Sequence, residues 1–171
     1  MKEYKALFRR DDRRWILANR AGWIGVPFAT SPDLVRDGPE PYVDAAASVG
    51  DGSLVLNVAE PDGVTEIVVP ADVSSLRNAV GALLLDTFVI SSPSTRWLAL
   101  ISEAEYGVCV GEPALVAGIV GASQDYALAE FARYTEEWTR RPAYLDAVLN
   151  LPWHEFGRPD TRSEFMLPPP L

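Results

Sequence analysis

Residues 87–113 read TFVISSPSTRWLALISEAEYGVCVGEP, and this stretch decides the fold. Three runs of apolar and β-favouring residues alternate here with two polar segments that are typical of turns. The runs cover 87–90, 97–102 and 107–110, and the turns cover 91–94 and 103–106. Because short connections join antiparallel neighbours, we predict a three-stranded antiparallel meander.

A hairpin and a helix are predicted before the meander. Two β-rich runs, 53–59 and 64–69, flank the turn sequence Glu-Pro-Asp-Gly at 60–63. Ser74 or Ser75 is then expected to cap a helix that continues to about Leu85. The residues expected on its buried face are Leu76, Val80, Leu83 and Leu84.

Two helices are predicted after the meander. The main one is expected over 123–140, with Ser123 as its cap and an acidic residue, Asp125, in its first turn. The residues expected on its buried face are Leu128, Phe131, Ala132, Thr135 and Trp138, with Tyr134 flanking them. A second helix is expected to start at Pro142 and to end at Leu149. The apolar run 113–120 fits either the start of a helix or a buried connection.

The N-terminal region and the C-terminal tail are less regular. Segments 4–8 and 14–18 fit two strands or, alternatively, a helix that begins near Asp11, and their β-favouring residues favour strands. Ser31 is expected to cap a short helix over 32–35, with an irregular connection after it. The proline-rich tail, 157–171, is expected to be poorly ordered.

The predicted fold class is α+β, with a mainly antiparallel sheet and two or more packed helices, in one globular domain over 1–171. The 171 residues are 48% hydrophobic and 23% charged, which is typical of a chain with a buried core and excludes bulk disorder. The longest uncharged run, 113–124, is shorter than the ~20 residues of a membrane span. An N-terminus without an apolar signal region then indicates a cytoplasmic protein.

The charge is strongly acidic and unevenly distributed. The net charge is −9, with +4 in residues 1–36 (eight basic, four acidic) and −13 in residues 37–171 (seven basic, twenty acidic). An acidic chain suits a basic partner and argues against nucleic acid, whose phosphates need cations. The one basic cluster, Arg9–Arg14, is split by two aspartates and is interpreted as a self-neutralising surface.

The residue types that carry most enzyme chemistry are scarce. The chain has one cysteine, Cys109, and one histidine, His154, far apart in sequence. A structural zinc site needs several such ligands, and no phosphate-binding glycine loop is present. Cys109 is expected to be a quiet core residue and His154 a dispensable one. We therefore expect no catalytic residue, no metal and no cofactor.

The stretch 87–113 also resembles small cytosolic bacterial toxin-immunity proteins. The likeness lies in a strand that ends in small polar residues, a tryptophan that opens the next strand, an acidic turn, and a glycine that opens a third. It covers 27 of the 171 residues. The resemblance implies a non-enzymatic, acidic protein that occludes the active site of a toxin, and it transfers no binding residue.

The leading hypothesis is a non-enzymatic protein-binding protein, an immunity protein against a basic toxin being one form of it. Two alternatives stay open: a small-molecule enzyme that uses carboxylates in an unrecognised pocket, and a homo-oligomeric accessory protein. The candidate binding residues are Glu103, Glu105 and Glu112, in or just beyond the predicted turns. Turns project from a sheet, so side chains there can reach a partner without disturbing the core.

Overall fold

The structure, a computed structural model, describes residues 8–11, 14–60, 63–83, 86–138, 142–159 and 164–167. Its strands are β1 (Phe8–Asp11), β2 (Arg14–Ala18), β3 (Ile24–Ala29), β4 (Ser53–Glu60), β5 (Gly63–Pro70), β6 (Phe88–Ser91), β7 (Trp97–Ile101), β8 (Tyr106–Gly111) and β9 (Glu164–Met166). Its helices are α2 (Pro32–Asp37), α3 (Glu40–Ser48), α4 (Val73–Gly81), α5 (Pro113–Val120), α6 (Gln124–Glu136) and α7 (Ala143–Leu149), with a 3-10 turn, η1 (Trp153–Glu155).

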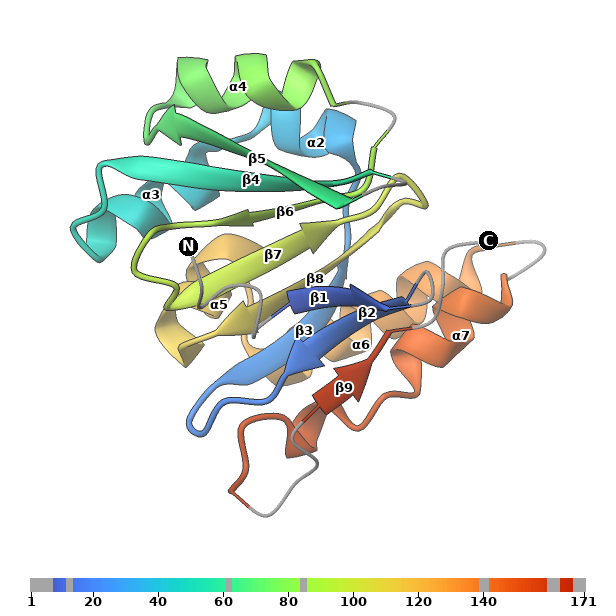
Figure 1. Cartoon of the computed structure of the whole chain (residues 1–171). Coiled ribbons are helices and arrows are strands. Elements are labelled where there is room, and N and C mark those ends of the chain that lie inside the picture. The colour runs from blue at the N-terminus through green and yellow to red at the C-terminus, as the bar shows by residue number, and fades with distance from the viewer. Residues whose placement is uncertain are drawn as a thin grey trace.

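Six strands form one antiparallel sheet in the order β3-β8-β7-β6-β4-β5, which confirms the predicted α+β class (Figure 1). The meander is confirmed as β6-β7-β8, and the hairpin as β4-β5. The predicted strand boundaries agree to within a residue or two, because the turns that separate the strands have strong local signals.

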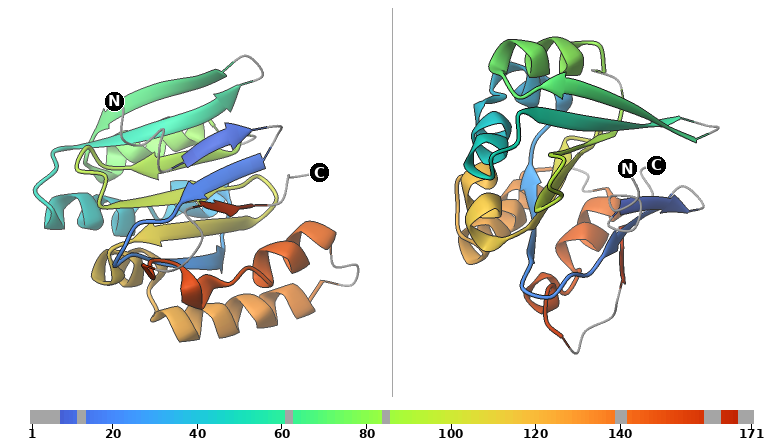
Figure 2. Two further views of the ribbon diagram at one scale, coloured as in Figure 1. Left: turned by 60° about the horizontal axis from the view of Figure 1, so that its bottom comes forward. Right: turned by 60° about the vertical axis from the view of Figure 1, so that its left-hand side comes forward.

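The sheet is covered on both faces. Strands β6, β7 and β8 are therefore buried along their whole length. Figure 2 (right) shows α3, α4 and α5 on one side of the sheet, and β1, β2 and α7 on the other. Alternate strand residues point to opposite faces, so Ile90 and Ala99 belong to the hydrophobic cluster under α2–α5, and Val89 and Leu98 to the cluster under α7 and η1.

A second, three-stranded sheet has the order β1-β2-β9. It confirms the predicted strand 14–18 as β2. The strand before it, β1, lies at 8–11, and residues 4–7 of the predicted strand 4–8 lie outside the described residues. The second sheet also corrects part of the expectation of a poorly ordered tail over 157–171, because β9 pairs antiparallel with β2 and places Leu17 opposite Phe165. Phe165 and Leu167 are buried, and the Phe165 ring lies 4.9 Å from that of Phe156. Burial of these apolar side chains orders this segment.

Two helical expectations needed correction. Helix α3 occupies 40–48, where an irregular connection was expected, because Tyr42, Ala45 and Ala46 form a buried stripe at helical spacing. Helix α6 begins after its Ser123 cap as expected, but it ends at Glu136, and Trp138 lies beyond it. The expected stretch 139–140 is outside the described residues. The open segment 113–120 is a helix, α5, which ends at Gly121 in the left-handed conformation.

The buried face of α6 is narrower than expected. Phe131 and Thr135 are buried, whereas Leu128, Ala132 and Trp138 are only half-buried. On α4, the cap is Asp72 in place of Ser74 or Ser75, and its carboxylate accepts from the Ser75 N–H at 2.8 Å. The helix ends at Gly81, short of the expected Leu85. Leu76 and Val80 are buried on it as expected, Leu83 is buried just beyond it, and 84–85 lie outside the described residues.

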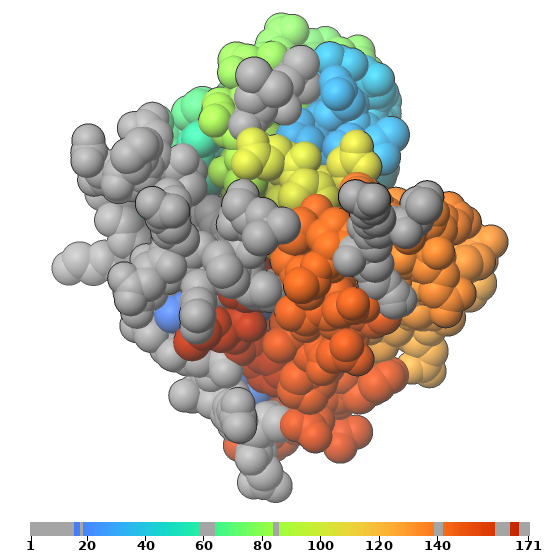
Figure 3. All heavy atoms as spheres, turned by 90° about the vertical axis from the view of Figure 1, so that its right-hand side faces the viewer, coloured from blue at the N-terminus to red at the C-terminus, as the bar shows by residue number. Residues whose placement is uncertain are grey.

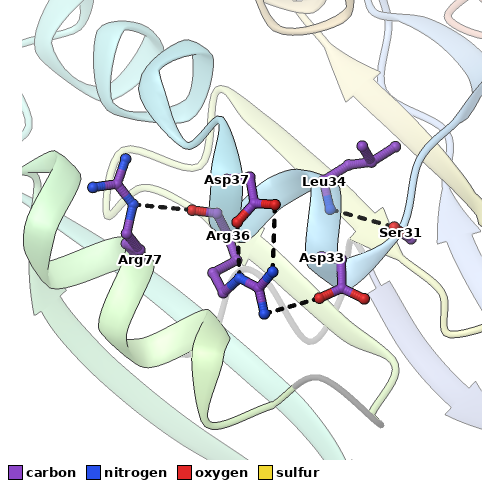
Figure 4. A network of polar contacts seen from close by, with 6 residues as sticks. All are labelled: Ser31, Asp33, Leu34, Arg36, Asp37 and Arg77. Atoms are coloured by element: carbon purple, nitrogen blue, oxygen red, sulfur yellow. Dashed lines mark hydrogen bonds and ion pairs between the residues drawn. The ribbon is translucent and has the colours of Figure 1, made fainter.

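Exposed polar contacts lie within α2 and between α2 and α4 (Figure 4). Arg36 pairs with Asp33 and Asp37, each at 2.9 Å, and the Arg77 Nε donates to the Arg36 carbonyl at 3.2 Å. Ser31 caps α2 as expected and accepts from the Leu34 N–H at 3.3 Å. Both ion pairs lie within α2 and, being exposed, stabilise the fold little; the Arg77 hydrogen bond is the contact that joins α4 to α2.

Candidate protein-binding surface

The turn between β7 and β8 carries two of the three predicted site residues, Glu103 and Glu105. Both side chains are exposed. The turn is closed by the Ser102 N–H, which donates to the Tyr106 carbonyl at 2.9 Å, and by the Ala104 N–H, which donates to the Ser102 hydroxyl at 3.1 Å. The sequence thus places the two carboxylates at one end of the sheet, as predicted.

Glu105 adopts a left-handed backbone conformation, with φ of 62°. This region is favourable for glycine and costs an L-residue with a β-carbon about 1 kcal/mol. A glutamate held in this conformation therefore destabilises the turn, and such backbone outliers are starting points for functional hypotheses.

Two tyrosines from helices far along the chain hold this turn. The Tyr134 hydroxyl on α6 donates to the Glu105 carbonyl at 2.8 Å, and the Tyr144 hydroxyl on α7 donates to the Ala104 carbonyl at 3.4 Å. Trp138 packs edge-on against Tyr134, with 6.1 Å between ring centroids. All three aromatic side chains are half-buried. We call Glu103, Glu105, Tyr134, Trp138 and Tyr144 the acidic–aromatic surface.

Figure 3 looks onto this end of the molecule, where the yellow β7–β8 turn borders the orange surface of α7. Burial raises the pKa of the Tyr144 hydroxyl, and the negative charge of Glu105 raises it further. The pKa of Tyr134 is raised by burial as well, with a further contribution from Glu105. Both tyrosines are therefore neutral hydrogen-bond donors near a carboxylate.

The carbonyl end of α6 adds to the negative potential. Glu136 and Glu137 stand there with exposed side chains, although a helix favours cations at this end. Arg133 on the same helix is ion-paired with Glu130 at 2.5 Å. Arg140 and Arg141 follow in the sequence and lie outside the described residues. The described part of this end thus presents carboxylates beside aromatic rings.

Glu112, the third predicted site residue, does not join this surface. It lies just beyond the opposite end of β8, where Arg96 binds its carboxylate through two hydrogen bonds of 2.6 and 2.5 Å. Those hydrogen bonds from Arg96 hold the pKa of Glu112 below its usual range. The Glu112 carboxylate is therefore already bound by a side chain of the same protein.

Cys109 and His154 are the residues whose types most often carry enzyme chemistry, and the structure buries the first and exposes the second. Cys109 is fully buried on β8, and burial raises the pKa of its thiol. His154 is exposed on η1, with its Nδ1 3.7 Å from an Asp125 carboxylate oxygen. Among the described residues, no group of three or more His, Cys, Asp or Glu side chains could hold a metal ion.

The aromatic half of the surface was missed from sequence. Tyr134 was expected only to flank the buried face of its helix, and Tyr144 had no assigned role. Their convergence on one turn depends on how α6 and α7 pack on the sheet, for which the sequence holds no local signal. The left-handed conformation of Glu105 has no sequence signal either, because glycine or asparagine would mark it.

Comparison with protein-family models, curated proteins and solved structures finds no match to this chain. In the described part of the chain, every helix is too short or too polar to cross a bilayer.

Proposed function

We propose that the protein is a non-enzymatic binding protein that captures a basic protein on the acidic–aromatic surface. The observation that carries the proposal is Glu105, an exposed carboxylate in a costly backbone conformation, held at the turn by Tyr134 and flanked by Tyr144. Carboxylates next to half-exposed aromatic rings match an arginine or lysine, because such a cation gains both an ion pair and a cation–π contact.

The rest of the surface supports recognition in two ways. The exposed carboxylates of Glu136 and Glu137 at the end of α6 favour an approaching cation, and a net charge of −9 steers a basic partner over a longer distance. Tyrosine and tryptophan are also the residues that dominate binding energy at protein interfaces. By the resemblance of residues 87–113 to immunity proteins, we propose a basic toxin as the partner, occluded while it is bound.

The test compares two variants with the same change in charge. Glu103→Lys with Glu105→Lys reverses the surface, and Glu40→Lys with Asp44→Lys reverses two exposed carboxylates on α3, at the left of Figure 1 and away from the turn. Proteins from the source cell that bind the native chain are identified and purified, with no selection on either variant. Their association rates are then measured at low and high salt.

We expect the turn variant to associate several-fold more slowly at low salt and less so at high salt, because salt screens exposed charges. The α3 variant should retain most of the native rate. Equal slowing in both variants would show that only net charge matters, and the specific surface would then be wrong.

A second variant separates stability from binding. Glu105→Gly should raise the free energy of unfolding by up to about 1 kcal/mol, because glycine tolerates a positive φ. The same variant should bind the partner more weakly. A gain in stability with unchanged binding would remove Glu105 from the interface.

A further inference from the structure

The outer strand of the large sheet, β5, has one side paired with β4 and no strand on its other side within the described residues. In an antiparallel pair, alternate residues exchange both backbone hydrogen bonds, and the residues between them point their N–H and C=O groups away. The Ala71 N–H donates to the Gly52 carbonyl at 3.1 Å, which fixes the phase of the ladder just beyond β5.

The register then assigns each residue of β5. Val69, Ile67 and Thr65 are the bonded partners of Leu54, Leu56 and Val58. The residues between them are Val64, Glu66 and Val68, and their backbone groups point away from β4. The strand therefore presents three N–H donors and three carbonyl acceptors along its outer side, up to Pro70, which has no N–H to offer.

The side chains of the same three residues lie on one face of the sheet and are exposed. The exposed fractions are 43% for Val64 and 58% for Val68, and Glu66 lies between them. An eight-residue edge with β-branched side chains has the geometry that added strands use in peptide recognition. The row of side chains reads apolar, acidic, apolar.

The central glutamate decides which strand fits. If a second copy paired its β5 antiparallel about this point, Val64 would face Val68 of the other copy and Glu66 would face Glu66. Like charges directly opposite each other destabilise a strand pair, and two chains of charge −9 also repel each other at longer range. A strand with a basic residue at the centre gains a cross-strand ion pair instead.

We propose that the free edge of β5 takes up an extended segment of a partner protein as an added antiparallel strand, with a lysine or arginine opposite Glu66 and β-branched or apolar residues opposite Val64 and Val68. The backbone groups of the three outward-facing residues supply the hydrogen bonds, and Glu66 supplies the charge selectivity. The inference rests on β5 alone, so it stands or fails independently of the acidic–aromatic surface.

The probe is a synthetic peptide, acetyl-Thr-Val-Thr-Lys-Thr-Val-Thr-amide, titrated into the isotope-labelled full chain and followed by NMR. Its matched control has glutamate in place of the lysine. We expect the lysine peptide to shift the amide signals of Val64, Glu66 and Val68, to slow their hydrogen exchange, and to bind at least fivefold more tightly than the glutamate peptide.

Two variants test the two parts of the proposal. Val68→Pro removes an outward N–H but no bond to β4, and it should weaken binding of the lysine peptide at least tenfold. Glu66→Lys should reverse the preference, so that the glutamate peptide binds more tightly. Should Val68→Pro fail to fold, the charge reversal at Glu66 still decides the proposal. Glu103→Lys with Glu105→Lys should leave peptide binding unchanged.

Three results would overturn the proposal. The first is no shift on β5 with either peptide, and the second is equal affinity for both peptides. The third is slow exchange of the Val64, Glu66 and Val68 amides before any peptide is added, because it shows that the edge is already covered. If that protection fades on dilution, a second copy covers the edge; if it persists, the chain covers it itself.

Discussion

The two outer strands of the large sheet differ in how their edges are covered: β3 is closed by other parts of the chain, and β5 has no strand beside it in the described residues. On β3, Pro27 has no N–H to offer, and the Gly25 carbonyl accepts from the Gln124 side-chain amide at 3.0 Å. The same Gln124 amide also donates to the Trp153 carbonyl at 3.1 Å, which ties η1 to this edge. On β5, the backbone groups of Val64, Glu66 and Val68 point away from β4, and no strand pairs with them in the described part of the chain.

The covered edge is also where the two hydrophobic clusters meet. Helix α6 places Ala127 in the cluster under α2–α5 and Phe131 in the cluster on the other face. One helix that packs around a sheet edge closes that edge and adds to both cores. Edge strands are a recognised liability in β-sheet proteins, so an edge left open beside one covered so fully is informative. The contrast is that α6 closes the β3 edge, whereas no strand pairs with the outer side of β5 in the described part of the chain.

The largest effect should come from breaking the cover of β3. Phe131→Ala removes a buried ring of α6 and should lower the free energy of unfolding by about 3–5 kcal/mol, measured by urea denaturation. Tyr126→Ala, at an exposed position of the same helix, should change it by less than about 0.5 kcal/mol. A loss below 1 kcal/mol for Phe131→Ala would mean that α6 is not a structural cover.

A pair of proline substitutions tests which side of β5 is free. Ile67→Pro removes an N–H that bonds to β4 and leaves a carbonyl unpaired, so we expect a loss of about 2–3 kcal/mol. Val68→Pro removes only an outward N–H, and its loss should stay below about 1 kcal/mol. Thermal and urea unfolding of both variants measures the difference. Similar losses in the two would contradict the assigned phase of the ladder.

The two hydrogen bonds that the Gln124 amide donates at the β3 edge should contribute less to the free energy of unfolding. Gln124→Ala leaves the Gly25 and Trp153 carbonyls without their donor and should lower the free energy of unfolding by about 1–2 kcal/mol. Gln124→Glu should lose at least as much at pH 7, because a carboxylate has no N–H to donate. An unchanged free energy of unfolding in both variants would show that the Gln124 hydrogen bonds do not stabilise the β3 edge.

The smallest effect should be a gain in stability next to the open edge. Asn57 on β4 lies opposite Glu66 and is only 2% exposed, and neither its amide nitrogen nor its carbonyl oxygen has a hydrogen-bond partner in the described part of the chain. Asn57→Val removes these unpaired groups and adds a β-favouring side chain, so we expect a gain of about 1 kcal/mol. A clear loss of stability in urea would show that the amide is in fact bonded.

Local features made most of the fold predictable from sequence. The turn-forming sequences at 60–63 and 91–94 separate strands that pair with each other, and Ser123 marks the start of its helix by a local cap. Helix α3 was missed because the prolines at 39 and 41 indicate a turn, although Pro39 is the N-cap and Pro41 lies in the first turn, where proline is tolerated. The strand around Phe165 was missed because its partner is about 150 residues away.

The candidate site divides in the same way. Glu103 and Glu105 were predictable because a turn exposes them whatever packs nearby. The role of Glu112 was not, because its neighbour Arg96 is supplied by a different strand connection. The tyrosines and the order of the strands, and with it the identity of both edges, depend on contacts between distant segments, which hydrophobic periodicity does not encode.

The position of Cys109 gives the chain a built-in chemical reporter. The thiol is fully buried on β8 directly opposite Val26 of β3, and it is the only one in the sequence. Its side chain lies in the hydrophobic cluster under α2–α5, so a thiol reagent reaches it when the cover of that face opens or the whole fold unfolds. The rate of labelling, followed by mass spectrometry on the native sequence, reads out that opening without any engineered dye or cysteine. Comparison with amide exchange at Val64 sets the opening of this face beside the exposure of the β5 edge on a single time axis.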